Sequence, residues 1–527
     1  MNRWHFFLVH ITLFLVITLF AEQRWPDILL LSAQIIFIPT LFIAIVGKNS
    51  LFRKLYPYIA IPAYTSVAII TIFPTVPSIY AAIIYGLFTL FIAFYGIVRF
   101  FQRGFISMEE FAIDSGFIFL FVGGLWYIAY HAGIDTGFPP LITWLTAIHF
   151  HYSSSIMLIF IGLLGRIKKD KQYTIMTSMM IVLPWIIAVG ITFTRWIELI
   201  GIVFYIIATY SFIIFSIRIT FKSIYQKIAS VIAFSTVGIT IILACLYILS
   251  NGFNMPIITI HTMLMTHGIM NAGLFGFVGT IGWLITIPKA TYIRPTFPLS
   301  PIRKKTFLEE ENPHAAGLVE RMDTYIPSPQ RKYMTTNIKD FYEHTSNYRL
   351  QAKIQWAGWF LPFAFIYKGL SSIVEQINLP LSSKQVEMTG EVLHIDEGSD
   401  GRQDVRAWIR KISGNLVFVA LYSKHKTDGR TYMNIALPLP LTSMHGILAC
   451  SMTPNGLELT SVRKDEMKDA GIYLAIGKQG YFRLPLSETF FVEEVKGKLV
   501  ATHNMKIIGL HFLTIDYEIM KKVHEII

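Results

Sequence analysis

Polar residues that could do chemistry stand together inside an apolar run, Ile148–Ser155, whose sequence is IHFHYSSS. A second apolar run holds His261, His267 and Asn271. A neutral imidazole binds metals, accepts hydrogen bonds and carries protons. Ionisable groups in a membrane-spanning helix are costly and usually face the bundle interior or a water-filled cavity. These residues are therefore the first candidates for a site.

Helix geometry limits which of these side chains can meet. His149 and His151 are two residues apart, about 200° around a regular helix, and point to nearly opposite sides. His261 and His267 diverge in the same way, whereas His267 and Asn271 are four residues apart and share a face. The spacing predicts an inward cluster of either His149 or His151 with His267 and Asn271.

Further polar residues would complete such a cavity. Tyr152 and Ser153–Ser155 are expected to line its wall. Glu198, which can pair with Arg195 one turn earlier, is expected nearer the outer mouth. Asp114, near the inner end of another apolar run, is a lesser candidate as a ligand of a coupling ion.

The mid-membrane residues have three interpretations. They could only form hydrogen bonds between helices, they could line a transport pathway or ligand pocket, or they could hold a metal or haem. No HExxH, HxxxH pair or carboxylate-rich iron motif occurs in the chain, so the metal and cofactor stay unknown. No catalytic residue is predicted.

The composition places these residues in a membrane protein. The chain has 527 residues, of which 54% are hydrophobic, and a mean hydropathy of +0.53. Such a chain is too apolar for an ordinary soluble protein. We predict a multi-span transmembrane domain over 1–288, a proline-rich, charged cytoplasmic linker over 289–334, and a cytoplasmic α+β domain over 335–527. With two cysteines and no CxxC motif, a disulfide framework is excluded.

About twenty apolar residues cross a bilayer as a helix. Ten runs qualify, at about 5–21, 28–47, 56–73, 79–101, 111–131, 139–165, 174–193, 197–217, 228–250 and 256–287. With the N-terminus inside, the inner segments carry eighteen Lys and Arg residues and the outer segments only Arg24 and Arg195. This asymmetry predicts a cytoplasmic N-terminus and a cytoplasmic C-terminal domain. It also accounts for the net charge of +12 without a nucleic-acid partner, and leaves the lipid bilayer as the expected partner.

The C-terminal domain is predicted to be rich in antiparallel hairpins. A helix is expected over about 335–350, and Trp356–Leu370 is too short to span, so it suits either the membrane surface or a core helix. Paired strands flank Asp428-Gly429, TPNG and KGK. We expect one antiparallel sheet, curved or partly closed over a helix, which could hold an apolar or lipid-like ligand. The histidines of this sheet are interpreted as surface or sheet residues: His425, His445, His503 and His511.

Two stretches resemble the bacterial YndJ-like membrane proteins. They are Trp144–Arg166, WLTAIHFHYSSSIMLIFIGLLGR, and His261–Trp283, HTMLMTHGIMNAGLFGFVGTIGW. The resemblance covers the membrane domain and implies an integral membrane protein with a sheet-rich extension. The family has no established activity and is sometimes labelled a transporter on its topology, so the resemblance brings no functional residue to this chain.

Together these observations favour a transporter or permease-like protein of the bacterial plasma membrane. Ten spans, polar groups at mid-depth and the lack of GxSxG, GxxxxGK[ST] or GxGxxG motifs at strand-to-helix junctions support this hypothesis. One alternative is a membrane enzyme or redox protein that holds metal or haem through the histidines. A second alternative is a membrane-anchored sensor or assembly factor with a ligand-binding cytoplasmic domain.

Overall fold

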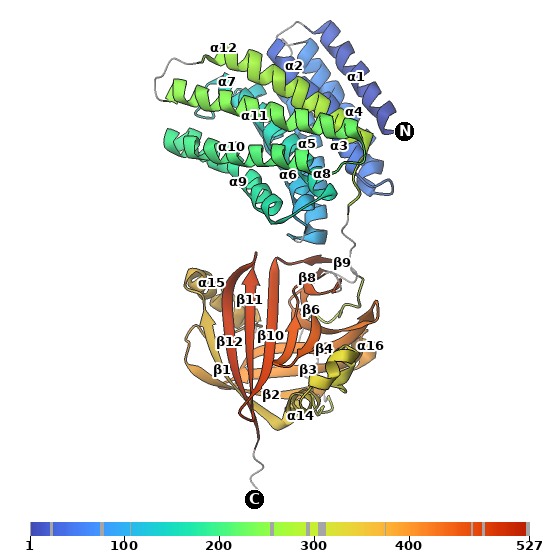
Figure 1. The fold of residues 1–527 in the computed structure, drawn as a ribbon, viewed down its shortest axis with the longest axis vertical. Helices are drawn as coiled ribbons and strands as arrows, with labels where there is room; N and C mark the ends of the chain where they lie inside the picture. Colours follow the sequence, from blue (N-terminus) through green and yellow to red (C-terminus); the bar gives the residue numbers. More distant parts are fainter. Residues whose placement is uncertain are drawn as a thin grey trace, which may run out of the picture. The chain divides into compact units, whose positions relative to one another are not determined.

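The computed structural model describes residues 2–21, 25–73, 78–105, 107–252, 258–290, 296–303, 312–374, 376–464, 467–476 and 480–522. The chain forms two compact units, Met1–Phe101 with Ser107–Tyr292, and Gln102–Ile106 with Ile293–Ile527. The first is all-helical and the second is built on a sheet (Figure 1). We call them the helical unit and the β unit. Arg24, Arg294 and the charged stretch 304–311, used in the sequence predictions, lie outside the described residues.

The predicted number of spans is confirmed. Within the described residues, ten helices are long and apolar enough to cross a membrane. Their elements are α1 (Arg3–Phe20); α2 (Trp25–Ser32), η1 (Ala33–Phe37) and α3 (Ile38–Ile45); α4 (Leu51–Ile72); α5 (Ile79–Arg103); α6 (Met108–His131); α7 (Pro140–His149), η2 (Phe150–Ile156) and α8 (Met157–Ile167); α9 (Lys171–Phe193); α10 (Arg195–Arg218); α11 (Ile224–Gly252); and α12 (Ile260–Met263), η3 (Leu264–Gly268), η4 (Asn271–Val278) and α13 (Gly279–Ile285).

The second, sixth and tenth spans each contain π-helical turns, namely η1, η2, and η3 with η4. A π-helical turn is wider than an α-helical turn and often marks a functional site. The segments η1, η2 and η4 contact one another. The candidate residues of IHFHYSSS and of the tenth span therefore lie where the helix ladder departs from α geometry.

Ion pairs lock α5, α6 and α8 together. The Glu110 carboxylate accepts hydrogen bonds from Arg99 (2.5 Å) and from Arg166 (2.7 and 2.9 Å). Arg99 also pairs with Asp114 at 2.9 Å, and Lys169 with Glu109 at 2.5 Å. All three carboxylates are buried, and the three cations balance their charge. Asp114, considered above as an ion ligand, is thus engaged by an arginine.

The β unit is a closed barrel. Its twelve-stranded antiparallel sheet runs in the order β5-β4-β3-β2-β1-β12-β11-β10-β7-β6-β8-β9, and β5 also pairs with β6, which closes the ring (Figure 1). The strands are β1 (Tyr348–Trp356), β2 (Gln385–His394), β3 (Gln403–Ile412), β4 (Asn415–Thr427), β5 (Arg430–Leu439), β6 (Thr442–Thr453), β7 (Gly456–Thr460), β8 (Gly471–Ile476), β9 (Gly480–Arg483), β10 (Leu486–Val495), β11 (Lys498–Ile507) and β12 (Leu510–Lys521). The predicted hairpins correspond to β4–β5, β6–β7 and β10–β11.

Aromatic and apolar side chains fill the barrel. Trp408, Met433, Leu448 and Ile515 are among the buried residues of its core. The cavity that remains has a volume of about 50 Å³, far below the size of sites that take drug-sized ligands. This cavity is therefore too small for the lipid-like ligand that the sheet was expected to hold.

Two local predictions for the β unit differ from the structure. The helix expected over 335–350 ends early, because α14 covers Thr336–Glu343 and β1 begins at Tyr348. The residues of β1 alternate between buried and exposed, which is the period of a strand with one covered face. The segment predicted as a linker also contributes Leu318 and Met322 to the barrel core.

We predict that Glu110→Gln strongly destabilises the helical unit. The substitution leaves Arg99 and Arg166 buried with one carboxylate fewer, and breaking a buried ion pair costs about 3–5 kcal/mol. Thermal unfolding of the purified chain in detergent measures the effect. Lys168→Gln, at an exposed position near the end of α8, is the matched control and should leave the midpoint unchanged. Equal midpoints for the two variants would contradict the assigned role of the cluster.

Candidate functional site

The stretch IHFHYSSS takes its unusual helix geometry from its own side chains. His149 and His151 donate Nδ1–H to the carbonyl oxygens of Leu145 (2.7 Å) and Ala147 (2.8 Å), each four residues earlier. Ser153 Oγ donates to the carbonyl oxygen of His149 at 2.7 Å. Side-chain donors to these carbonyls compete with the backbone ladder and distort helices. The π-helical turns of η2 fall at this point.

The two histidines of this stretch face opposite sides, and His149 is the one that faces the tenth span. The ring centroids of His149 and His267 are 6.3 Å apart. His267 Nδ1 donates to the carbonyl oxygen of Thr240 at 2.9 Å. Because a carbonyl oxygen can only accept, the proton of each neutral ring is on Nδ1. Within the described residues neither Nε2 has a hydrogen-bond partner, so both remain acceptors.

Thr240 of α11 ties together the two polar residues of the tenth span. Its carbonyl oxygen receives His267, and its hydroxyl donates to Asn271 Oδ1 at 3.2 Å. The i, i+4 relation between His267 and Asn271 thus places both residues against one residue of the neighbouring helix. Their orientation is set by α11 as well as by their own helix.

These residues line a cavity of about 500 Å³ in the helical unit. Most of its wall is apolar, from the second span and from the sixth to the tenth. The polar lining comprises Thr146, His149, Tyr152, Ser153, Ser154, Arg195, Glu198, Tyr205, Thr240, Tyr247, His267 and Asn271. A mostly apolar pocket of this size with a few convergent polar groups has the character of a ligand site.

Glu198 lines the cavity as one member of an ion pair. Its carboxylate lies 2.6 Å from Arg195 Nη1, and the two residues are three apart at the start of α10. The Glu198 side chain is largely buried, whereas that of Arg195 is half-exposed. A ligand near Glu198 would therefore meet a paired carboxylate.

Tyr152 lines the cavity, but its hydroxyl is already hydrogen-bonded to the second span. That hydroxyl donates to the carbonyl oxygen of Leu29 at 2.7 Å and lies 2.7 Å from Ser32 Oγ. These bonds join the sixth span to the second. Tyr152 thus supplies ring surface to the cavity, and its polar atom holds the two helices together.

Three residues predicted for the site or its wall lie away from the cavity, and one of them is Ser155, which is completely buried outside the lining. His151 is fully buried on the other face of the sixth span, where its Nε2 accepts from the Tyr85 hydroxyl at 2.8 Å. His261 is exposed near the start of the tenth span and is not part of the lining. The physical reason is the angular spacing in each helix, which turns one histidine of each pair outward from the cavity.

The geometry for a metal is limited to the facing imidazoles. Within the described ranges, no group of three or more His, Cys, Asp or Glu side chains is arranged to hold a metal ion. His149 and His267 could supply two imidazole ligands, and other ligands would have to come from a cofactor or solvent.

The β unit contains a second buried polar network. Ser443 Oγ lies 2.9 Å from His445 Nε2, and His445 Nδ1 lies 3.3 Å from Asn434 Oδ1. The hydrogen bonds connect a serine to a histidine and the histidine to an asparagine, as in a nucleophile–histidine–orienter arrangement. All three side chains are completely enclosed, so no substrate reaches them. Burial, with Arg402 and Arg303 nearby, holds the pKa of His445 well below its usual value. His425 and His503 are also buried, and these three histidines lie on the strands β4, β6 and β11, which is the sheet position allowed for them by the prediction.

The fold and this cavity define a polytopic helical membrane protein that carries a closed antiparallel barrel. The chain belongs to the YndJ-like family. The family model described as YndJ-like protein matches residues 28–277. The uncharacterized membrane protein YndJ of Bacillus subtilis (strain 168) is 36% identical over 460 residues, which cover 83% of each chain. No solved structure matches this chain.

We predict that His151→Ala and His149→Ala differ sharply in stability. Removing the His151 ring leaves a cavity and an unpaired Tyr85 hydroxyl, at a cost of about 2–4 kcal/mol. His149→Ala removes a side chain that already borders open space and should cost less than about 1 kcal/mol. Thermal unfolding in detergent distinguishes the two variants. A larger loss for His149→Ala would reverse the structural and ligand-facing roles assigned here.

Proposed function

We propose that this protein is a transporter or permease-like protein of the bacterial plasma membrane that binds a small amphipathic molecule in the cavity of the helical unit. The observation that carries the proposal is the facing pair His149 and His267, which presents two unpaired Nε2 acceptors in a mostly apolar pocket. Polar groups without protein partners are costly inside a membrane unless a ligand or water meets them.

The lining indicates the chemistry of the ligand. Two imidazole acceptors favour a ligand that donates hydrogen bonds, such as a hydroxyl. The apolar wall favours a hydrocarbon body attached to that group. Because Glu198 is balanced by Arg195, the site offers no uncompensated carboxylate for a strongly cationic ligand.

We place the N-terminus and the β unit on the cytoplasmic side. The support is the distribution of Lys and Arg between alternate loops, eighteen against two. Arg99, Arg166 and Lys169 belong to the basic side and are also members of the buried ion-pair cluster. Without these three, the basic side still carries a large excess.

Access to the cavity from both sides of the membrane tests transport. In a Cys245→Ser background, Ser153→Cys places a thiol in the cavity lining. We expect a membrane-impermeant methanethiosulfonate reagent to modify it in intact cells and also in inverted vesicles. Modification from one side only would contradict transport and favour a receptor, and no modification from either side would contradict an open cavity.

Ser155→Cys is the matched control for this experiment. Ser155 lies two residues further along the same helix, is completely buried and is not part of the cavity lining. The same reagent should leave its thiol unmodified from both sides. The native Cys450 is also fully enclosed, and burial raises the pKa of its thiol to about 12, so its reaction should not obscure the result.

A further inference from the structure

The two ends of the barrel differ in character. Strand pairings place the β3–β4, β5–β6 and β11–β12 turns at one end, together with the segment between β1 and β2. We call this end the apolar rim, and its defining residues are Phe363, Phe365, Ile366, Leu441, Ile508 and Leu510. All six are exposed, Ile366 to 73% and Leu441 to 85%. Large exposed apolar side chains gathered at one end of a domain mark a candidate interaction surface.

Helix α15 (Leu361–Val374) supplies half of the rim. It follows β1 through η9 (Gly358–Phe360), where Phe360 packs on Trp356 and Phe512 of the barrel. Trp359 Nε1 donates to the carbonyl oxygen of His511 at 2.9 Å, beside the β11–β12 turn. The start of the helix is thus fixed to the barrel, and one turn later Phe363 and Phe365 extend into solvent.

The charged side chain of α15, Lys368, is bonded to the segment that follows the helix. Lys368 Nζ donates to Asn378 Oδ1 at 2.6 Å and to the carbonyl oxygen of Leu379 at 3.1 Å. Ala364 is buried, between the exposed Phe363 and Phe365. The outward face is therefore aromatic and aliphatic, as in helices that lie in a membrane interface.

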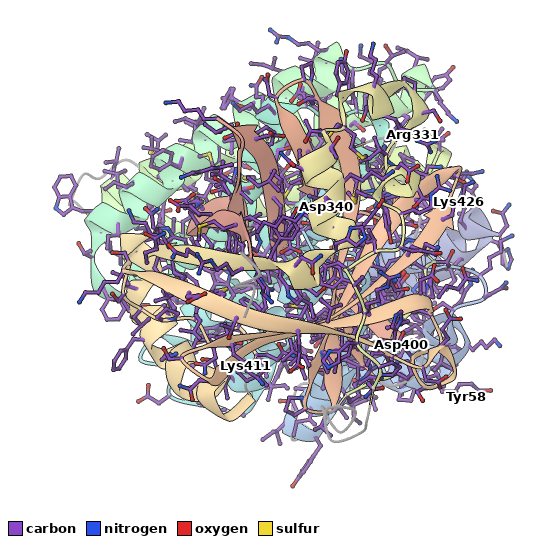
Figure 2. The ribbon with its side chains drawn as sticks, turned by 90° about the horizontal axis from the view of Figure 1, so that it is seen from below. Tyr58, Arg331, Asp340, Asp400, Lys411 and Lys426 are labelled. Carbon is purple, nitrogen blue, oxygen red and sulfur yellow. The ribbon has the colours of Figure 1, made fainter. Side chains whose placement is uncertain are left out.

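The turns at the two ends differ in charge. Three turns described at the rim, Ser413-Gly414, Pro440-Leu441 and Ile508-Gly509, have no acidic residue. The opposite end carries Asp428 and Lys426 at the β4–β5 turn, and Asp340 bound to Lys521. Figure 2 looks from below, with Asp340 and Lys426 labelled. Turns without carboxylates avoid repulsion by anionic lipids.

The length of the chain ties the barrel to the bilayer. The last apolar helix ends at Ile285, and Phe297 already packs against Tyr473 and Tyr481 of the barrel wall. The segment between Ile285 and Phe297 spans at most about 40 Å when fully extended. The barrel is therefore held within reach of a lipid surface at all times.

We infer that the apolar rim is a lipid-binding surface, which inserts α15 and the β11–β12 turn into the interfacial layer of the membrane. The occupant is the bilayer itself. Insertion removes the exposed Phe, Ile and Leu side chains from water, which is favourable. This inference does not depend on the cavity of the helical unit or on transport.

Spin labels on the full-length protein test this inference. In a Cys245→Ser background, single cysteines replace Ile366 and Ile508, and Val495→Cys beside the β10–β11 turn is the matched control at the opposite end. The labelled chains are reconstituted in vesicles of phosphatidylethanolamine and phosphatidylglycerol. Power saturation then compares collisions with oxygen, which enters lipid, and with an aqueous nickel complex.

We expect the ratio of oxygen to nickel collisions to be at least several-fold higher for both rim labels than for the Val495 label. Equal ratios at the two ends would overturn the inference. A second copy of the chain could instead cover the rim. In that case the rim labels would be shielded from both reagents, and their spectra would show dipolar broadening that disappears on dilution with unlabelled protein; this result would also overturn it.

Discussion

A polar group inside a membrane has to find its partner within the protein, and the sixth span shows how this constraint shapes the helical unit. His151 and Tyr152 meet the demand by bonding to Tyr85 of α5 and to Leu29 and Ser32 of the second span. Those bonds fix the central helix between its neighbours. Within the part of the chain that the structure describes, His149 has a hydrogen-bond partner only at Nδ1, and its Nε2 faces the cavity.

The helical unit separates charge from the cavity. The buried carboxylates of α6 are matched by Arg99, Arg166 and Lys169. This cluster therefore has no net charge and holds the helices together. The polar groups that face the cavity are mostly uncharged, and the Glu198 carboxylate has Arg195 beside it. Strong electrostatic forces therefore hold the scaffold, whereas weaker and reversible hydrogen bonds remain for a ligand.

Much of the membrane topology could be predicted because it depends on local sequence. Hydropathy predicted the ten spans, and the spacing of polar residues predicted a cluster of either His149 or His151 with His267. Which histidine turns inward could not be decided, because that depends on η2 and on Thr240, a residue of another helix. The Glu110 cluster was missed because its arginines were counted only as topology signals. Hairpin turns predicted neighbouring strands, but the long-range pairing that closes the barrel has no local signal.

The way the barrel closes determines when it can fold. β1 has β2 on one side and β12 on the other, from Tyr348 opposite Lys521 to Trp356 opposite Leu513. β1 therefore lacks its second partner strand until β12 has been made. The ring cannot close during synthesis until residue 521 has left the ribosome. Until then β1 and β11 each present an unpaired edge, the kind of surface that recruits other chains. A premature stop before β12 would leave both edges open permanently.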